Sequence, residues 1–223
     1  MVQAHNKRPN IILVLVDDMG FSDLGLTGSE IRTPNIDSIA RNGVLLSAMY
    51  NCARCCPTRA ALLTGLYPHN AGIGHMGAYL GSPAYQGFLR NDSATIAEAL
   101  RLAGYRTLMS GKWHVGGDYT ARLVDSWRVG DLEHPTPRQR GFDRFYGILD
   151  GFTNLHHPHR LMSDNQVVEV EQYPEGYYLT DDLTDRCLSW WKELRASHPR
   201  KPWFTYLAHP ACHAPLHAKP HDI

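Results

Sequence analysis

Three cysteines lie within five positions, and Cys55 has the surroundings that a reactive group needs. It precedes Pro57 by two positions and Arg59 by four. The stretch Pro57–Thr64 predicts a helix with proline in its first turn, so the cysteines lie just ahead of a helix N-terminus. Unpaired backbone N–H groups favour an oxyanion there, and Arg59 adds a cation one turn along. The spacing therefore indicates a site for a tetrahedral oxyanion beside a sulfur side chain.

Two adjacent carboxylates stand at the end of an apolar run. Asp17 and Asp18 follow Asn10–Val16, whose unbroken apolar character predicts a central strand buried on both faces of a parallel sheet. Ligands of open α/β sheets bind at the carboxyl ends of the strands, and carboxylate oxygens suit Ca²⁺ or Mg²⁺. Taken alone, the pair equally suits a solvated turn, and Cys55 equally suits a buried thiol.

Strands and helices alternate along the chain, as in α/β folds with a mostly parallel sheet. The region between Gly116 and Glu175 is interrupted by proline, glycine and histidine, and it predicts long surface loops over an active-site face. The remaining predicted strands are Val44–Tyr50, Tyr105–Ser110 and Pro202–Ala208, and the remaining predicted helices run from Thr33 to near Gly43, over Thr95–Ala103 and over Thr180–Leu194.

The stretch from Cys55 to Gly65, read Cys-Cys-Pro-Thr-Arg and ending Leu-Thr-Gly, resembles the signature of the type I, formylglycine-dependent sulfatases of the alkaline-phosphatase superfamily. Asp17-Asp18 matches that family's first metal-binding pair, and Gly111-Lys112-Trp113-His114 looks like its G-K-W-H motif. Ala211-Cys212-His213-Ala214-Pro215 is similar to its P-H-x-P turn, with Cys212 where the family has proline. The resemblance implies an α/β fold with a mostly parallel central sheet flanked by helices.

The resemblance also implies a nucleophile and a metal. Cys55 would be oxidised to formylglycine by a formylglycine-generating enzyme, and the hydrated aldehyde would attack the sulfur of a sulfate ester, with an aryl sulfate favoured. Asp17, Asp18 and the modified Cys55 would bind Ca²⁺, with Mg²⁺ as the alternative. A plain thiol has no good way to release sulfate afterwards, whereas a diol expels it by losing its second proton.

Four further side chains receive roles from the resemblance. Arg59 and Lys112 would stabilise charge on the sulfate oxygens. His213 would donate a proton toward the leaving oxygen, and His114 would accept the proton of the remaining hydroxyl. Without the resemblance, Arg59 equally suits a surface salt bridge and Lys112 equally suits packing over Trp113.

Members of the resembled family are commonly more than twice as long as these 223 residues and carry a second, Asp-Asn metal pair further on. Asp164-Asn165 is such a dipeptide, but it precedes the His213 turn, which is the wrong order. We therefore expect residues 1–223 to be the N-terminal part of a sulfatase catalytic domain whose C-terminal part is missing.

Two alternatives to a sulfatase remain open at this stage. The first is a phosphonate monoester or phosphodiester hydrolase of the same superfamily, because sulfate and phosphate share tetrahedral geometry. The second is an inactive truncated fragment, because distal metal ligands are not found.

Charge and terminal sequence bear on partners and location. Lysine plus arginine and aspartate plus glutamate both number 22, so no global field favours nucleic acid or an anionic membrane. The polar start followed by six apolar residues matches neither a secretory signal nor a transmembrane helix. The expectation is a cytoplasmic enzyme with a small-molecule sulfate ester as its partner.

Other cysteines and histidines allow ordinary interpretations. Cys187 and Cys212 suit small buried hydrophobes. The histidines at 156, 157 and 159 lie in a proline-interrupted loop and either line a substrate site or face solvent. A zinc site would use Cys52, Cys55, Cys56 and His69, although a second ligand pair with the usual spacing is missing.

Overall fold

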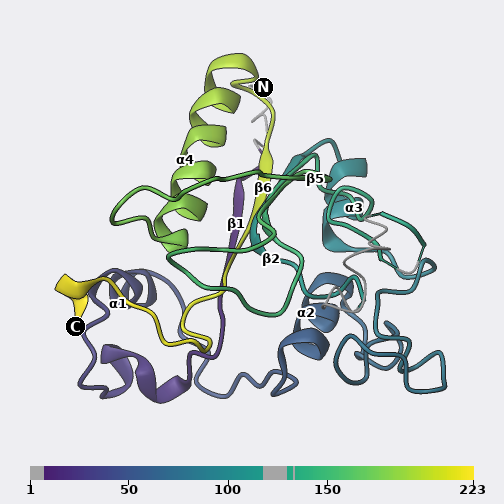
Figure 1. Ribbon diagram of the computed structural model, residues 1–223, viewed down its shortest axis with the longest axis horizontal. Helices are drawn as coiled ribbons and strands as arrows, with labels where there is room; N and C mark the ends of the chain where they lie inside the picture. Colours follow the sequence, from purple (N-terminus) through teal and green to yellow (C-terminus); the bar gives the residue numbers. More distant parts are fainter. Residues whose placement is uncertain (1–7, 118–129, 133) are drawn as a thin grey trace, which may run out of the picture.

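The computed structural model describes residues 8–117, 130–132 and 134–223, and Figure 1 shows a central sheet with helices on both of its faces. The α-helices are α1 (Pro34–Arg41), α2 (Cys55–Thr64), α3 (Ile96–Leu102) and α4 (Leu179–Ser197). The strands are β1 (Ile11–Val16), β2 (Arg106–Lys112), β3 (Arg144–Ile148), β4 (Met162–Ser163), β5 (Gln166–Val167) and β6 (Trp203–His209). Short 3₁₀ turns cover Phe21–Asp23, Gly25–Thr27 and Pro220–Asp222.

The sheet has the strand order β1-β6-β2-β3-β4-β5. β1, β6, β2 and β3 are parallel, and the two short strands β4 and β5 continue the sheet antiparallel. Parallel strands carry their carboxyl ends to one edge, so Asp17, Lys112 and the residues after His209 meet there. The predicted α/β class with a mostly parallel sheet is confirmed.

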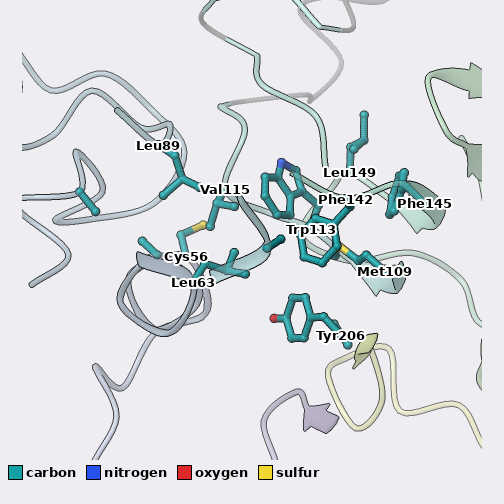
Figure 2. Packing of buried hydrophobic residues seen from close by; sticks show 14 of the residues in the cluster. Cys56, Leu63, Leu89, Met109, Trp113, Val115, Phe142, Phe145, Leu149 and Tyr206 are labelled. Carbon is teal, nitrogen blue, oxygen red and sulfur yellow. The ribbon is translucent and has the colours of Figure 1, made fainter. Parts of the chain in front are cut away.

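Each face of the sheet carries its own apolar core. α2 and α3 pack on one face around Trp113, Phe142 and Tyr206, which Figure 2 shows beside Met109 and Leu63. α4 packs on the other face, where its apolar residues meet alternate residues of β2, β3 and β6. Neighbouring strand residues point to opposite faces, so Leu108 and Met109 belong to different cores.

β1 lies at the edge of the sheet, and only one of its faces is covered. Ile11, Leu13 and Leu15 pack against the core of α2 and α3, whereas Ile12 and Val14 are 49% and 54% exposed. The prediction of a central strand buried on both faces is therefore wrong. An apolar run does not reveal which neighbours will cover it.

β2 and β3 approach each other closely at a glycine pair. Gly111 and Gly147 lie opposite one another, with φ of +119° and +148°. A Cβ atom on Gly147 would lie 2.1 Å from the carbonyl oxygen of Gly111, so only glycine fits. This contact sets the carboxyl end of β2, where Lys112 follows.

Several predicted boundaries differ from the structure. α2 begins at Cys55, two residues earlier than predicted, so Cys55 and Cys56 belong to its first turn instead of preceding it. Val44–Tyr50 forms no strand and is largely exposed. The predicted loop region contains β3, β4 and β5, and residues 118–129 and 133 of it lie outside the described part.

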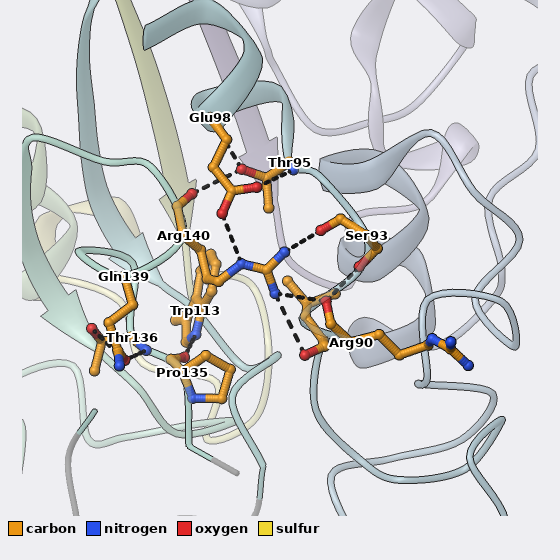
Figure 3. A network of polar contacts seen from close by, with 10 residues as sticks. Arg90, Ser93, Thr95, Glu98, Trp113, Pro135, Thr136, Gln139 and Arg140 are labelled. Carbon is orange, nitrogen blue, oxygen red and sulfur yellow. Dashed lines mark hydrogen bonds and ion pairs between the residues drawn. The ribbon is translucent and has the colours of Figure 1, made fainter. Parts of the chain in front are cut away.

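Arg140 ties two loop regions to α3, as Figure 3 shows. Its guanidinium pairs with Glu98 at 3.1 Å and donates to the carbonyl oxygens of Leu89, Arg90 and Ser93. Thr95 caps α3 by accepting from the backbone N–H of Glu98, and its hydroxyl donates to the carbonyl of Arg140. One nearly buried cation therefore satisfies several buried carbonyl groups.

Among the described helices, none combines the length and the apolar character that crossing a membrane would require.

Replacing Arg140 with alanine should lower the free energy of unfolding by about 3 kcal/mol, because buried carbonyl groups lose their donors. Arg140→Lys should recover little of this loss, since an ammonium cannot reproduce the fork of a guanidinium. Urea unfolding followed by tryptophan fluorescence measures the change. Arg90→Ala is the matched control, because the Arg90 side chain pairs only with the exposed Asp92 among its described contacts; equal losses for Arg90→Ala and Arg140→Ala would contradict the role of Arg140.

Candidate active site

The Asp17 carboxylate, directly after β1, pairs with two buried cations. Arg59 Nη2 lies 3.1 Å from Asp17 Oδ1, and Lys112 Nζ lies 2.5 Å from Asp17 Oδ2. Arg59 also donates from Nη1 to the carbonyl oxygen of Lys112 at 2.8 Å. The side chains of Arg59 and Lys112 are 1% and 0% exposed. The alternative predictions, a surface salt bridge for Arg59 and packing over Trp113 with a solvent-exposed ammonium group for Lys112, are therefore wrong.

A pair of backbone hydrogen bonds joins the end of β1 to the segment after β6. The N–H of Asp17 donates to the carbonyl of Ala211 at 2.9 Å, and the N–H of Cys212 donates to the carbonyl of Asp17 at 2.6 Å. These bonds bring His213 to Asp18, with His213 Nε2 3.8 Å from Asp18 Oδ2. The Cys212 side chain is exposed, which contradicts its prediction as a buried hydrophobe, whereas Cys187 is buried as expected.

Cys55 occupies the first position of α2, where backbone N–H groups are unpaired by the helix. Its sulfur, the sulfur of Cys56 and a ring nitrogen of His114 all lie within 4.8 Å of one another. The hydrogen bond with Cys56 lowers the pKa of the Cys55 thiol, and His114 and Lys112 lower it further. The same hydrogen bond, together with burial, raises the pKa of the Cys56 thiol. Position 55 is therefore a site that stabilises negative charge.

His114 carries a neutral imidazole beside Cys55. Burial is the main cause that lowers its pKa, and the charges of Lys112 and Arg59 act in the same direction. Within the described residues, His114 Nδ1 is buried without a hydrogen-bond partner. A neutral imidazole in this position can accept a proton.

Two cavities share the side chain at position 55. The smaller, of about 230 Å³, is bordered by Asp17, Asp18 and Arg59, with Asn51 at its rim. The larger, of about 310 Å³, is bordered by Cys55, His114 and His213. Its remaining wall includes Asp150, Phe152, His159 and Arg160. Six of the seven residues predicted for the site therefore border at least one of the two cavities. The seventh, Lys112, is buried and pairs with Asp17.

The smaller cavity has the donor set of a hard cation. Asp17 and Asp18 offer carboxylate oxygens to it, and Asn51 adds an amide group at the same cavity. Oxygen donors suit Ca²⁺ or Mg²⁺, so these residues fit a divalent cation of that kind. The predicted alternative zinc set is not assembled among the described residues, since Cys55 and Cys56 gather with His114 and not with Cys52 or His69.

The wall of the larger cavity includes residues of the loop region predicted to cover an active-site face, but among them the sequence singled out only His159 as a candidate. It follows β3, a strand that was read as loop, although its aromatic residues Phe145 and Tyr146 are a strand signal. Of the three loop histidines, His159 borders the cavity. His156 instead packs against the rings of Tyr178 and His217. Gly151 gave no readable signal, yet a Cβ atom there would lie 2.6 Å from the His114 ring.

Comparisons with known proteins agree with this geometry. A family model described as Sulfatase matches residues 9–222. The arylsulfatase of Klebsiella aerogenes is 32% identical over 228 residues, which cover 96% of this chain and 45% of that protein. Arylsulfatase J of Mus musculus is 34% identical, with 96% and 34% of the two chains covered. The crystal structure of Ps i-CgsB in complex with k-i-k-neocarrahexaose gives a TM-score of 0.77 at 32% identity, covering 96% of this chain and 47% of that one. The chain thus spans about half, or less, of the length of these relatives.

Replacing Asp17 with asparagine should cost about 3 kcal/mol or more in the free energy of unfolding, because two buried cations lose the carboxylate that they share among the described residues. Chemical denaturation of the two variants measures this. Asp18→Asn is the matched control: its side chain is 59% exposed, and the change should stay within about 0.5 kcal/mol. Similar losses for both variants would show that Asp17 does not hold the cations in place.

The unconverted Cys55 thiol should react with iodoacetamide at low pH. Its pKa is lowered, so the thiolate persists as the pH falls below the usual thiol range and the alkylation rate should change little between about pH 6 and pH 9. Cys212 is the internal control, since partial desolvation of its exposed thiol and nearby carboxylates raise its pKa and its alkylation rate should rise throughout that range. Mass spectrometry of the two peptides measures both rates; parallel pH profiles would contradict the assignment.

Proposed function

We propose that this chain, which belongs to the sulfatase family, is the nucleophile-bearing part of a sulfate-ester hydrolase. Sulfatases generally use a formylglycine and a divalent metal, and the finer assignments to Cys55 and to Ca²⁺ are part of the proposal. The observation that carries it is the position of Cys55: it opens α2 and is the side chain that both cavities share. The N-terminal placement of residues 1–223 within a longer catalytic domain belongs to the same proposal.

The group at position 55 supplies the covalent chemistry. As formylglycine hydrate, it offers one hydroxyl to attack sulfur and a second whose deprotonation re-forms the aldehyde and releases sulfate. Arg59 and Lys112 stand directly behind this position with Asp17 between them, so one net positive charge remains after the carboxylate is counted. That fixed charge stabilises the oxyanion and the sulfate oxygens without reorganisation of solvent.

His114 and His213 divide the proton transfers. Neutral His114 lies next to position 55 and accepts the proton of the hydroxyl that does not attack. His213, in the segment after β6, borders the same cavity and donates a proton to the ester oxygen as the S–O bond breaks. His213 Nε2 lies 3.8 Å from Asp18 Oδ2, so this contact positions the imidazole at the cavity.

Asp17 and Asp18 are the proposed metal ligands, with Ca²⁺ preferred over Mg²⁺. When bound, the cation supplies a positive charge that lowers the pKa of a neighbouring hydroxyl and binds a sulfate oxygen. Its two known carboxylates are fewer than the usual six to eight oxygens of a calcium site, and water or other groups complete the set. Conversion of Cys55 further requires a formylglycine-generating enzyme as a transient partner.

Turnover of 4-nitrophenyl sulfate with Ca²⁺, after mass spectrometry has established conversion of the Cys55 peptide, tests the proposal. Cys55→Ala should reduce the rate by more than about a thousandfold, because no other group replaces the nucleophile. Cys52→Ala is the matched control and should retain the rate, since Cys52 has the wrong spacing to Pro57. A chelator should remove activity, and added Ca²⁺ should restore it.

Three results separate the proposal from its alternatives. Faster hydrolysis of a phosphonate monoester than of the sulfate would favour the phosphonate alternative. No turnover of either ester by the converted protein would favour an inactive fragment. Equal activity of the Cys55→Ala variant would exclude position 55 as the nucleophile.

A further inference from the structure

Phe152 is an exposed aromatic side chain in the wall of the larger cavity. It is 56% exposed, although a phenyl ring of this size is usually packed away. Its ring lies parallel to that of His213, with 4° between the planes and 6.2 Å between the centroids. In the proposed function the leaving oxygen receives its proton from His213, which brings the carbon skeleton attached to that oxygen to the part of the cavity that Phe152 shares with His213.

The backbone that carries Phe152 is held in place by its neighbours. Gly151 lies against the His114 ring, where any Cβ atom would clash at 2.6 Å. On the other side of Gly151, the nearly buried Asp150 pairs with Arg160 at 3.1 Å. The loop after β3 is therefore fitted closely to the proposed proton acceptor, and this fit fixes the position of Phe152.

The wall that carries Phe152 also contains His159, whose ring is held by Thr153. The Thr153 hydroxyl oxygen accepts the backbone N–H of His159 at 3.1 Å, and it lies 3.1 Å from His159 Nδ1. The hydroxyl hydrogen is free to bond Nδ1, which leaves the ring proton on Nε2. Partial burial and then the charge of Arg160 lower the pKa of His159, so the ring is neutral. The wall of the larger cavity therefore offers an uncharged N–H group in addition to the phenyl ring.

We propose that Phe152 determines specificity by stacking on a ring of the leaving group, so that esters of ring alcohols are preferred over esters of small alkyl alcohols. This inference rests on the proposed function, because it assumes that the sulfate occupies the space beside position 55. An aromatic ring and the apolar face of a sugar ring share the required flat surface. His159 would then donate to a ring substituent.

Binding of unreactive sulfonates tests the preference without turnover. Wild-type protein should bind benzenesulfonate about tenfold more tightly than methanesulfonate, measured by calorimetry, because stacking adds to the common sulfonate contacts. Phe152→Ala should remove most of that ratio, Phe152→Leu should restore part of it, and Phe152→Tyr should retain it. Tyr67→Ala, which removes an aromatic ring that is 80% exposed away from both cavities, should leave the ratio unchanged.

Hydrolysis then identifies the kind of ring. Kinetics with 4-nitrophenyl sulfate, a hexosamine 6-sulfate and ethyl sulfate should show Phe152→Ala raising KM for the preferred ring ester with kcat little changed, and sparing ethyl sulfate. The ester with the larger rise in KM distinguishes an aryl from a sugar leaving group.

Two results overturn the inference. One is a wild-type protein that binds benzenesulfonate no more tightly than methanesulfonate. The other is a Phe152→Ala variant that keeps the wild-type ratio. Either result stands whether or not the protein hydrolyses sulfate esters, so a failure of the proposed function, seen as absent turnover, is distinguished from a failure of ring recognition.

Discussion

One carboxylate between two buried cations is the interaction on which the site depends. Burying Arg59 and Lys112 is costly unless their charges are compensated, and Asp17 is the carboxylate that contacts both. Arg59 lies in α2, Lys112 ends β2 and Asp17 directly follows β1, so the same contact joins a helix to the ends of two non-adjacent strands. The ion pairs of Asp17 with Arg59 and Lys112 thus set the positions of the charged groups around position 55. The leftover positive charge is what an anionic group at position 55 would meet.

The two cavities separate different chemical tasks around one side chain. On one side stand carboxylates and an amide, which suit a hard cation. On the other stand imidazoles, a phenyl ring and small residues, which suit proton transfer and an organic group. Cys55 can border both cavities because it is the first residue of α2. Its side chain lies at the end of the helix, where the helix itself occupies neither cavity.

Chemistry-bearing residues were readable from the sequence because their spacing reflects local geometry. Cys55 and Arg59 are one helical turn apart, and Asp17 directly follows a strand, so both relations are visible in a few positions. Contacts between residues far apart in the sequence were not readable in this way. The sequence of Val44–Tyr50 is strand-like, but a strand needs a hydrogen-bonding partner, and the described neighbours offer none. β3 was hidden because its glycine, needed for close approach to Gly111, resembles a loop signal. The wall that carries Phe152 follows β3 and lies in the predicted loop region, but nothing in that loop sequence singled out Phe152.

The free backbone edge of β1 lies next to the carboxylates of the site. In the described part of the chain β1 bonds to β6 alone, which leaves a row of backbone donors and acceptors and the side chains of Ile12 and Val14 facing outward. Any polypeptide that joined this row in the same direction would finish level with Asp17. The residues that follow such an added strand would lie next to the cavity bordered by Asp17 and Asp18. Adding a strand to the sheet would therefore also bring further oxygen groups to that cavity.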